Sequence, residues 1–160
     1  MTRIYVAVCG PGEASERETG WAEEVGRRLA EAGATIVCGG LGGVMDAAAR
    51  GAADAGGTTI GILPGETRSG EGEHLTTSVV TGMGEARNTL VVRSADAIIA
   101  IAGEFGTLSE IALALKMGKP VVGLSTWGFS KPDGFAAPDP IVRASDPAEA
   151  VTEALRLAGR

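Results

Sequence analysis

One segment, from Ala97 to Leu124, constrains the fold of this chain more than any other. It begins with an apolar run rich in β-branched residues, Ala97–Ile101, which is typical of a strand that is covered on both faces. A short glycine-containing turn follows, then a helix expected from Thr107 to about Met117, and then a second apolar run over Val121–Leu124. This succession predicts a βαβ unit. In such a unit the turn lies at the carboxyl end of a parallel strand, where open α/β sheets bind their ligands.

The same alternation of strands and helices extends over the whole chain. Short apolar runs predict further strands over Ile4–Val8, Thr35–Cys38, Thr58–Leu63 and Leu75–Val80. Helices are expected over Ser15–Glu31, Val44–Ala55, a stretch that contains Arg87 and closes near Ser94, and a last helix that starts at Asp146-Pro147. The chain between Ser125 and Asp146 is expected to be irregular. We therefore expect residues 1–160 to form one α/β domain, a single doubly wound, Rossmann-like parallel sheet with helices on both faces.

Composition and charge exclude several classes of protein. The net charge is −6 and no basic run occurs, so an electrostatic face for nucleic acid is not expected. No stretch reaches the roughly 18 apolar residues of a membrane span, and the apolar run near the N-terminus is too short for a signal peptide. Cys9 and Cys38 form no CxxC pair, and each is either a small buried residue or faces a ligand crevice from a strand end. These features predict a soluble cytoplasmic protein without nucleic-acid or membrane partners.

Three strand ends are rich in glycine: Cys9–Gly12, Gly39–Gly43 and Gly103–Gly106. A single such loop needs no ligand to explain it, because a short strand-to-helix turn uses glycine for positive φ and for close packing. Three loops together are more informative, since the carboxyl ends of parallel strands lie on one edge of the sheet. They predict one crevice in which backbone N–H groups approach a phosphate. The candidate contacts are Gly10, Gly39, Gly40, Gly43, Gly103 and Gly106.

Two charged residues are candidates for chemistry at this crevice, and each has a plain structural alternative. Thr107-x-x-Glu110 has the form of a capping box, in which Thr107 is the N-cap and Glu110 bonds back to it. In the functional alternative, Glu110 lies in the first helical turn and acts as a base or stabilises positive charge. Arg87 follows Gly82 and Gly84 in the first turn of its helix, and is either a solvated surface residue or faces the same edge.

The remaining candidates carry weaker signals. Asn88 and Met83 either contact a ligand or complete the start of their helix. His74 is the only histidine, so it has no second histidine with which to form a metal site or a catalytic triad, and no metal site is expected. Asp46 is expected to be solvated. Trp127 either covers an end of the sheet or stacks on a ring.

Three motifs together resemble one known family. Gly39-Gly40-x-x-Gly43-x-Met45, Glu85-Ala86-Arg87-Asn88 and Gly103-x-x-Gly106-Thr107-x-x-Glu110 are similar to motifs of the LOG-like family of Rossmann-type nucleotide-binding proteins. The resemblance extends from about Ile4 to Leu124. The family includes cytokinin-activating phosphoribohydrolases and molybdenum-cofactor carrier proteins. The resemblance implies that Arg87 and Glu110 are the catalytic pair. It also implies that the helix starts at Gly40–Met45 and at Thr107 hold a phosphate.

The last motif departs from the phosphoribohydrolase pattern PGGxGTxxE. Ala102 stands in place of its proline and Glu104 in place of its second glycine, while Asn88 replaces the usual lysine after the arginine. Glu104 adds a negative charge beside the phosphate loop and favours a ligand other than a plain nucleotide. The run Glu110–Val122 is more similar to the carrier proteins and their bacterial relatives.

The resemblance leaves two functions open. In the first, the protein hydrolyses the N-glycosidic bond of a nucleoside 5′-monophosphate, releases the base and ribose 5-phosphate, and requires no cofactor. In the alternative, it is a non-catalytic carrier that binds molybdenum cofactor or a related phosphorylated pterin as its ligand. A pyridoxal-phosphate lysine decarboxylase is rejected, because the only lysines are Lys116 and Lys119 at a helix end and Lys131 in a loop. A homodimer or homotetramer is expected, with the alanine-rich helices over 44–55 and 107–117 suited to close packing against a partner.

Overall fold

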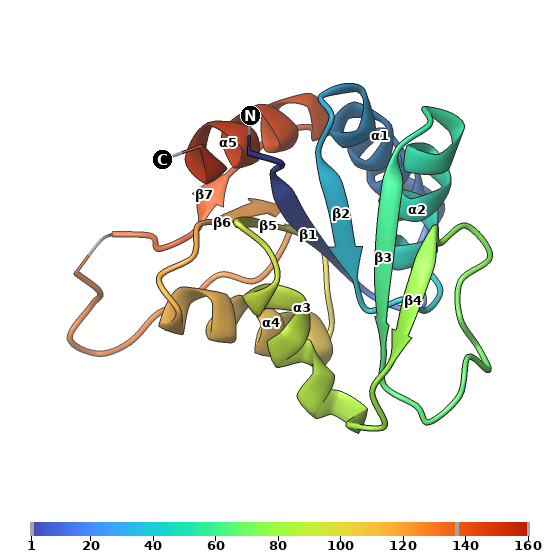
Figure 1. Cartoon of the computed structure of the whole chain (residues 1–160). Coiled ribbons are helices and arrows are strands. Elements are labelled where there is room, and N and C mark those ends of the chain that lie inside the picture. The colour runs from blue at the N-terminus through green and yellow to red at the C-terminus, as the bar shows by residue number, and fades with distance from the viewer. Residues whose placement is uncertain (1, 137, 160) are drawn as a thin grey trace.

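The computed structural model describes residues 2–136 and 138–159, and these form one sheet of seven strands (Figure 1). The strands are β1 (Tyr5–Cys9), β2 (Thr35–Cys38), β3 (Thr58–Leu63), β4 (Thr77–Val80), β5 (Ala97–Ile101), β6 (Val121–Leu124) and β7 (Val142–Arg143). Their order across the sheet is β4-β3-β2-β1-β5-β6-β7, and every neighbouring pair is parallel. The predicted α/β class with a Rossmann-like parallel sheet is confirmed.

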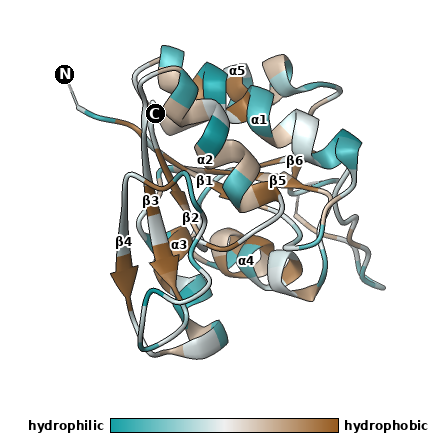
Figure 2. Ribbon diagram, turned by 90° about the vertical axis from the view of Figure 1, so that its right-hand side faces the viewer, coloured by the Kyte–Doolittle hydropathy of each residue, from teal (hydrophilic) through white to brown (hydrophobic). Residues whose placement is uncertain are grey.

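Helices cover both faces of the sheet, as predicted for a doubly wound fold. Helices α1 (Glu16–Glu31), α2 (Val44–Asp54) and α5 (Pro147–Ala158) pack on one face. The 3-10 helix η1 (Gly84–Arg87), α3 (Asn88–Arg93) and α4 (Phe105–Lys116) lie on the other (Figures 1 and 2). Within the described residues, no helix has both the length and the apolar character that crossing a membrane requires.

The position of β5 inside the sheet explains why its sequence is an uninterrupted apolar run. Its residues are all buried, and successive side chains point to opposite faces of the sheet. Ile99 and Ile101 pack in the core beneath α1, α2 and α5, whereas Ile98 and Ala100 pack in the core beneath α3 and α4. A strand that serves two cores has no solvent-facing side to make polar.

The alanines of α2 are used within the chain. Ala47, Ala48 and Ala52 are buried against the sheet and against α1, which approaches closely because it carries Gly26 opposite Ala48. A Cβ atom at Gly26 would lie 2.0 Å from the backbone oxygen of Ala48. The small residues of α2 that face α1 therefore bring two helices of one chain together.

Several element boundaries differ from the prediction. The first strand is Tyr5–Cys9 instead of Ile4–Val8, β4 starts at Thr77, and the segment expected to be irregular contains the short strand β7. Helix α4 begins at Phe105, with the extended residue Glu104 as its N-cap and no side-chain capping bond. The predicted capping box of Thr107 and Glu110 is therefore wrong, and Glu110 lies in the second turn of the helix. Gly103, at φ +123°, turns the chain early enough for this start.

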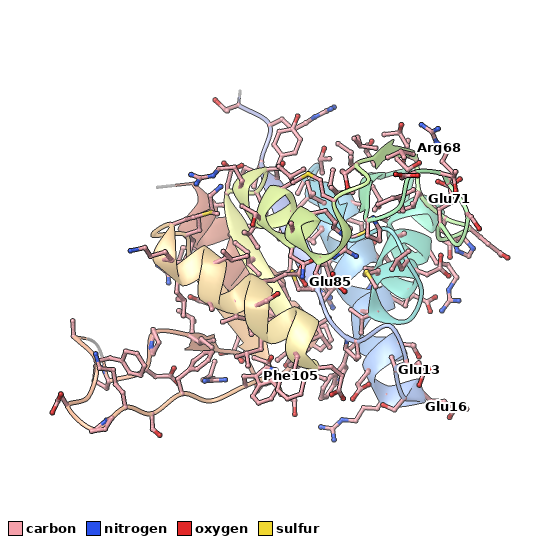
Figure 3. All side chains as sticks on the ribbon, turned by 90° about the horizontal axis from the view of Figure 1, so that it is seen from below. Glu13, Glu16, Arg68, Glu71, Glu85 and Phe105 are labelled. Atoms are coloured by element: carbon pink, nitrogen blue, oxygen red, sulfur yellow. The ribbon has the colours of Figure 1, made fainter. Side chains whose placement is uncertain are left out.

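The strand order places a ligand crevice between β1 and β5. From β1 the chain proceeds through β2 and β3 toward one edge of the sheet, whereas β5, β6 and β7 proceed toward the other. At such a switch point the connections leave the neighbouring strands in opposite directions, and the carboxyl ends of these strands are left open. Figure 3 views the molecule from this edge, with the labelled Phe105 at the start of α4 and Glu13 in the loop before α1.

Candidate functional site

A cleft of about 230 Å³ opens at the carboxyl ends of β1, β2 and β5. It brings together segments that are far apart in the sequence: the turn after β1, the turn after β2, the junction of η1 with α3, and the start of α4. Nine of the predicted site residues line it: Gly10, Gly39, Met45, Arg87, Asn88, Glu104, Gly106, Thr107 and Glu110. The prediction that distant glycine turns and two charged side chains meet at one crevice therefore describes this edge of the structure.

Arg87 is the last residue of η1, and its side chain is buried, with 9% of the residue exposed. Its Nε donates to the backbone oxygen of Ile62 at 2.8 Å, and its Nη2 donates to the backbone oxygen of Gly39 at 3.3 Å. A third bond runs from Nη1 to Oδ1 of Asn88. These bonds fix the guanidinium against the ends of β2 and β3. A guanidinium carries further N–H donors, which remain for a ligand in the cleft.

Asn88 connects Arg87 to helix α4. It accepts from the guanidinium through Oδ1 and donates through Nδ2 to Oγ of Ser109 at 3.0 Å. Ser109 in turn donates to the backbone oxygen of Gly106 at 2.6 Å. Asn88 is thus a positioning residue as well as part of the cleft wall, and this explains why an amide can stand where the phosphoribohydrolase pattern has a lysine.

Glu110 projects from the second turn of α4 and is 8% exposed. Burial raises the pKa of its carboxyl from 4.5 to about 7, although a hydrogen bond with the Cys9 thiol and the positive charge of Arg87 both favour the ionised form. Among the described residues, Arg87 and Glu110 form no ion pair within 4.0 Å. Glu110 can therefore hold or release a proton near neutral pH while Arg87 keeps its charge for an anion.

The sequence and the fold now identify the family. A family model described as the SLOG cluster4 family matches residues 3–151, which is most of the chain. The chain belongs to this family. An uncharacterised protein of Archaeoglobus fulgidus is 43% identical to it over 124 residues, which are 78% of this chain and 82% of that protein.

Two solved structures are similar over nearly the whole chain. The molybdenum cofactor binding protein from the phototrophic bacterium Rippkaea orientalis is 36% identical, with a TM-score of 0.89 and 98% of each chain covered. The molybdenum cofactor carrier protein from Chlamydomonas reinhardtii is 35% identical, with a TM-score of 0.86, and the match covers 99% of this chain and 100% of that chain. The resemblance to the LOG-like family that the motifs indicated is confirmed.

Four predicted site residues of this SLOG cluster4 protein lie outside the cleft lining: Gly40, Gly43, Gly103 and Met83. Gly43 is the N-cap of α2 at φ +62°, and a Cβ there would lie 2.2 Å from the backbone oxygen of Pro11. It lies where the loops after β1 and β2 touch, and it is partly buried there. The side chain of Met83 is solvent-facing, with 46% of the residue exposed. Gly103 lines a neighbouring cavity instead.

The candidate contacts named from the sequence left out five residues of the SLOG cluster4 cleft: Val8, Cys9, Pro11, Gly12 and Leu41. The turn Cys9–Gly12 was among the predicted crevice loops, and for Cys9 a position facing the crevice was one of two alternatives. Cys9 is the most informative of them, because its thiol bonds with Glu110. Burial, together with the neighbouring Glu110, raises the pKa of Cys9 well above its usual range, so the thiol stays protonated. The position of Cys9 at the carboxyl end of a central strand was the available signal. Cys38 is buried and lies outside the cleft lining.

Contacts elsewhere in the protein bear on two further expectations. Asp46 was expected to be solvated, but its Oδ1 lies 3.0 Å from Nδ1 of His74, so the two residues tie α2 to the loop before β4. Trp127 lies beside the start of α4, where its ring centroid is 5.9 Å from that of Phe105. Its Nε1 donates to the backbone oxygen of Glu104 at 3.2 Å.

Proposed function

We propose that this protein binds a phosphorylated pterin, molybdenum cofactor, in the cleft and carries it without chemical turnover. The observation that supports this most is the match, over 98–99% of the chain, to solved proteins named for binding or carrying molybdenum cofactor. The departures of Ala102 and Glu104 from the phosphoribohydrolase motif point in the same direction.

The cleft offers suitable groups for the phosphate of such a ligand. The first turn of α4 has backbone N–H groups without intrahelical partners, and these attract an anion. The unused N–H groups of Arg87 add a charged donor. Gly106, in that first turn, lines the cleft, and a Cβ placed on it would meet no atom within 4 Å. Its missing side chain therefore leaves room for a ligand to approach the backbone.

Filling this room tests the proposal. Gly106→Leu is expected to abolish binding of molybdenum cofactor released from a molybdenum enzyme, while the variant folds at least as stably as the wild type because Gly106 is helical. Gly20→Leu is the matched control, since Gly20 lies on α1 and also has no atom within 4 Å of a Cβ. Thermal unfolding with and without the cofactor measures both properties. At a hundredfold excess over Kd, wild type and control should gain about 2.7 kcal/mol. Equal gains in all three proteins would contradict the proposal.

A second function is supported by one specific observation, the carboxyl of Glu110 with a pKa of about 7 in the same cleft. A group that exchanges its proton near neutral pH suits general acid–base chemistry. In this alternative, Glu110 activates water or stabilises the positively charged ribosyl centre of a nucleoside 5′-monophosphate, as carboxylates do in glycosidases. Arg87 orients the phosphate.

The hydrolase alternative is tested by release of the free base from AMP, CMP, GMP and UMP. It expects activity in the wild type and a loss of about 10²–10⁴-fold in Glu110→Gln, the usual effect of removing a positioned acid or base. Chromatography of the released base measures the rate. A wild type as inactive as Glu110→Gln would reject this alternative and leave the carrier proposal standing.

We further expect a homodimer or homotetramer from the resemblance, and a cytoplasmic protein that binds no nucleic acid from the composition and the net charge of −6. Sedimentation velocity measures the oligomeric state, and a monomer at all concentrations would contradict that part.

A further inference from the structure

A second cavity, of about 350 Å³, lies beside the cleft and shares Pro11 and Glu104 with it. We name it the side cavity; its other walls include Ala102 after β5, and Ser125 and Trp127 after β6. Because the two hollows share wall residues, one ligand can occupy both. The cleft volume is below the roughly 300–1,000 Å³ of typical ligand pockets, so a nucleotide-sized molecule would extend beyond it.

The backbone around the side cavity is held in an unfavourable conformation. Ala102 (φ +48°) and Ser125 (φ +53°) are the non-glycine residues with positive φ in the described part of the chain, and both line this cavity. They follow the neighbouring strands β5 and β6, and the hydroxyl of Thr126 donates to the backbone oxygen of Ala102. Left-handed backbone at such residues costs about 1–3 kcal/mol and is retained mostly where a site requires it.

An aromatic surface borders the same cavity. Phe105 is 76% exposed at the start of α4, and the planes of its ring and that of Trp127 are inclined by 31°. The indole of Trp127 is fixed by its bond to the backbone of Glu104. An exposed aromatic side chain beside a fixed indole provides a surface on which a flat heterocycle can pack.

Glu104 supplies the polar group. Its side chain is exposed and has no hydrogen bond or ion pair within the described residues. Of the two other carboxylates in this cavity, Glu18 already accepts from the backbone N–H of Ser15, and Glu13 lies outside the cleft lining, whereas Glu104 lines both hollows. Across residues 2–136 and 138–159, no three His, Cys, Asp or Glu side chains are arranged to hold a metal ion.

A carboxylate such as that of Glu104 accepts two parallel N–H bonds most favourably. Guanine and pterins present such a pair on their 2-amino-4-oxo edge.

We propose that the side cavity holds the ring of the phosphorylated ligand, and that Glu104 selects a ring with a 2-amino-4-oxo edge. The inference rests on the proposed function, because it places the phosphate of the same molecule in the cleft. It adds a specificity-determining residue and a ring class, pterin or guanine over adenine and hypoxanthine.

Competition among four monophosphates tests this: neopterin monophosphate, GMP, IMP and AMP, measured by titration calorimetry at one pH and salt concentration. Neopterin monophosphate and GMP should bind about 10-fold or more tighter than IMP, which lacks the 2-amino group, and than AMP. In Glu104→Gln the preference should disappear while AMP and IMP bind as well as before. Glu85→Gln is the matched control, since Glu85 is an exposed carboxylate outside both cavities and should leave the preference unchanged.

The outcomes separate this inference from the proposed function. Equal affinities for all four ligands in the wild type, or a preference that survives in Glu104→Gln, would overturn the role of Glu104. If molybdenum cofactor still stabilises the wild type but not Gly106→Leu, the proposed function stands without the side cavity. If none of the four ligands binds, the inference is overturned, and failure of molybdenum cofactor to bind as well would remove the proposed function with it.

Discussion

The free energy of unfolding of the wild type is expected to fall by about 3 kcal/mol between about pH 4.5 and pH 8, and Glu110→Gln is expected to abolish this fall. In the folded wild type, burial raises the pKa of Glu110 from 4.5 to about 7. Between these two values the folded chain retains a proton that the unfolded chain has released. Stability is therefore highest below the unfolded pKa and is lost as the pH rises through the folded one. Glutamine is neutral at every pH and cannot show this dependence.

Urea unfolding of both proteins across that pH range measures the effect. Other carboxyls act in the opposite direction, because Arg143 lowers the pKa of Asp139, so the informative quantity is the difference between wild type and variant. Glu85→Gln controls for the loss of one exposed carboxyl and should keep the wild-type fall. If the curves of wild type and Glu110→Gln run parallel, Glu110 is not buried as the structure places it.

Gly26→Ala is expected to destabilise the protein by about 3 kcal/mol or more. The added Cβ would lie 2.0 Å from the backbone oxygen of Ala48 and 2.8 Å from its carbonyl carbon. Neither atom belongs to a flexible side chain, so α1 and α2 would have to move apart over their buried contact. The same geometry holds at Gly51, whose Cβ would lie 2.0 Å from the backbone oxygen of Glu23.

Gly20→Ala on the same helix is the matched control for this prediction. A Cβ at Gly20 meets no atom within 4 Å, and alanine is favoured over glycine inside a helix by about 1 kcal/mol, so this variant should be slightly more stable than the wild type. Chemical unfolding of the two variants gives the comparison. Similar stabilities of Gly26→Ala and Gly20→Ala would show that the helices are not in the close contact described.

The cleft shows which features of the site can be predicted from local sequence patterns and which cannot. Glycine turns after β1, β2 and β5 were sufficient to predict a crevice, because parallel strands bring their carboxyl ends to one edge. The bond between Cys9 and Glu110 and the fixation of Arg87 by backbone oxygens join residues from different strands and helices. No spacing in the sequence encodes those contacts. The Thr107–Glu110 pattern even pointed to a capping box that the early start of α4 excludes.

The sequence by itself determined the elements whose cause is local. The continuous apolar run of β5 could only be a strand with two buried faces, and Ser15 and Asp146 cap α1 and α5 through their own side chains. Only the tertiary structure decided that Glu110 is buried enough to hold its proton, that Arg87 is immobilised, and that a second cavity adjoins the cleft. Burial and cavity walls are properties of several segments packed together, so they exist only once the strand order is set.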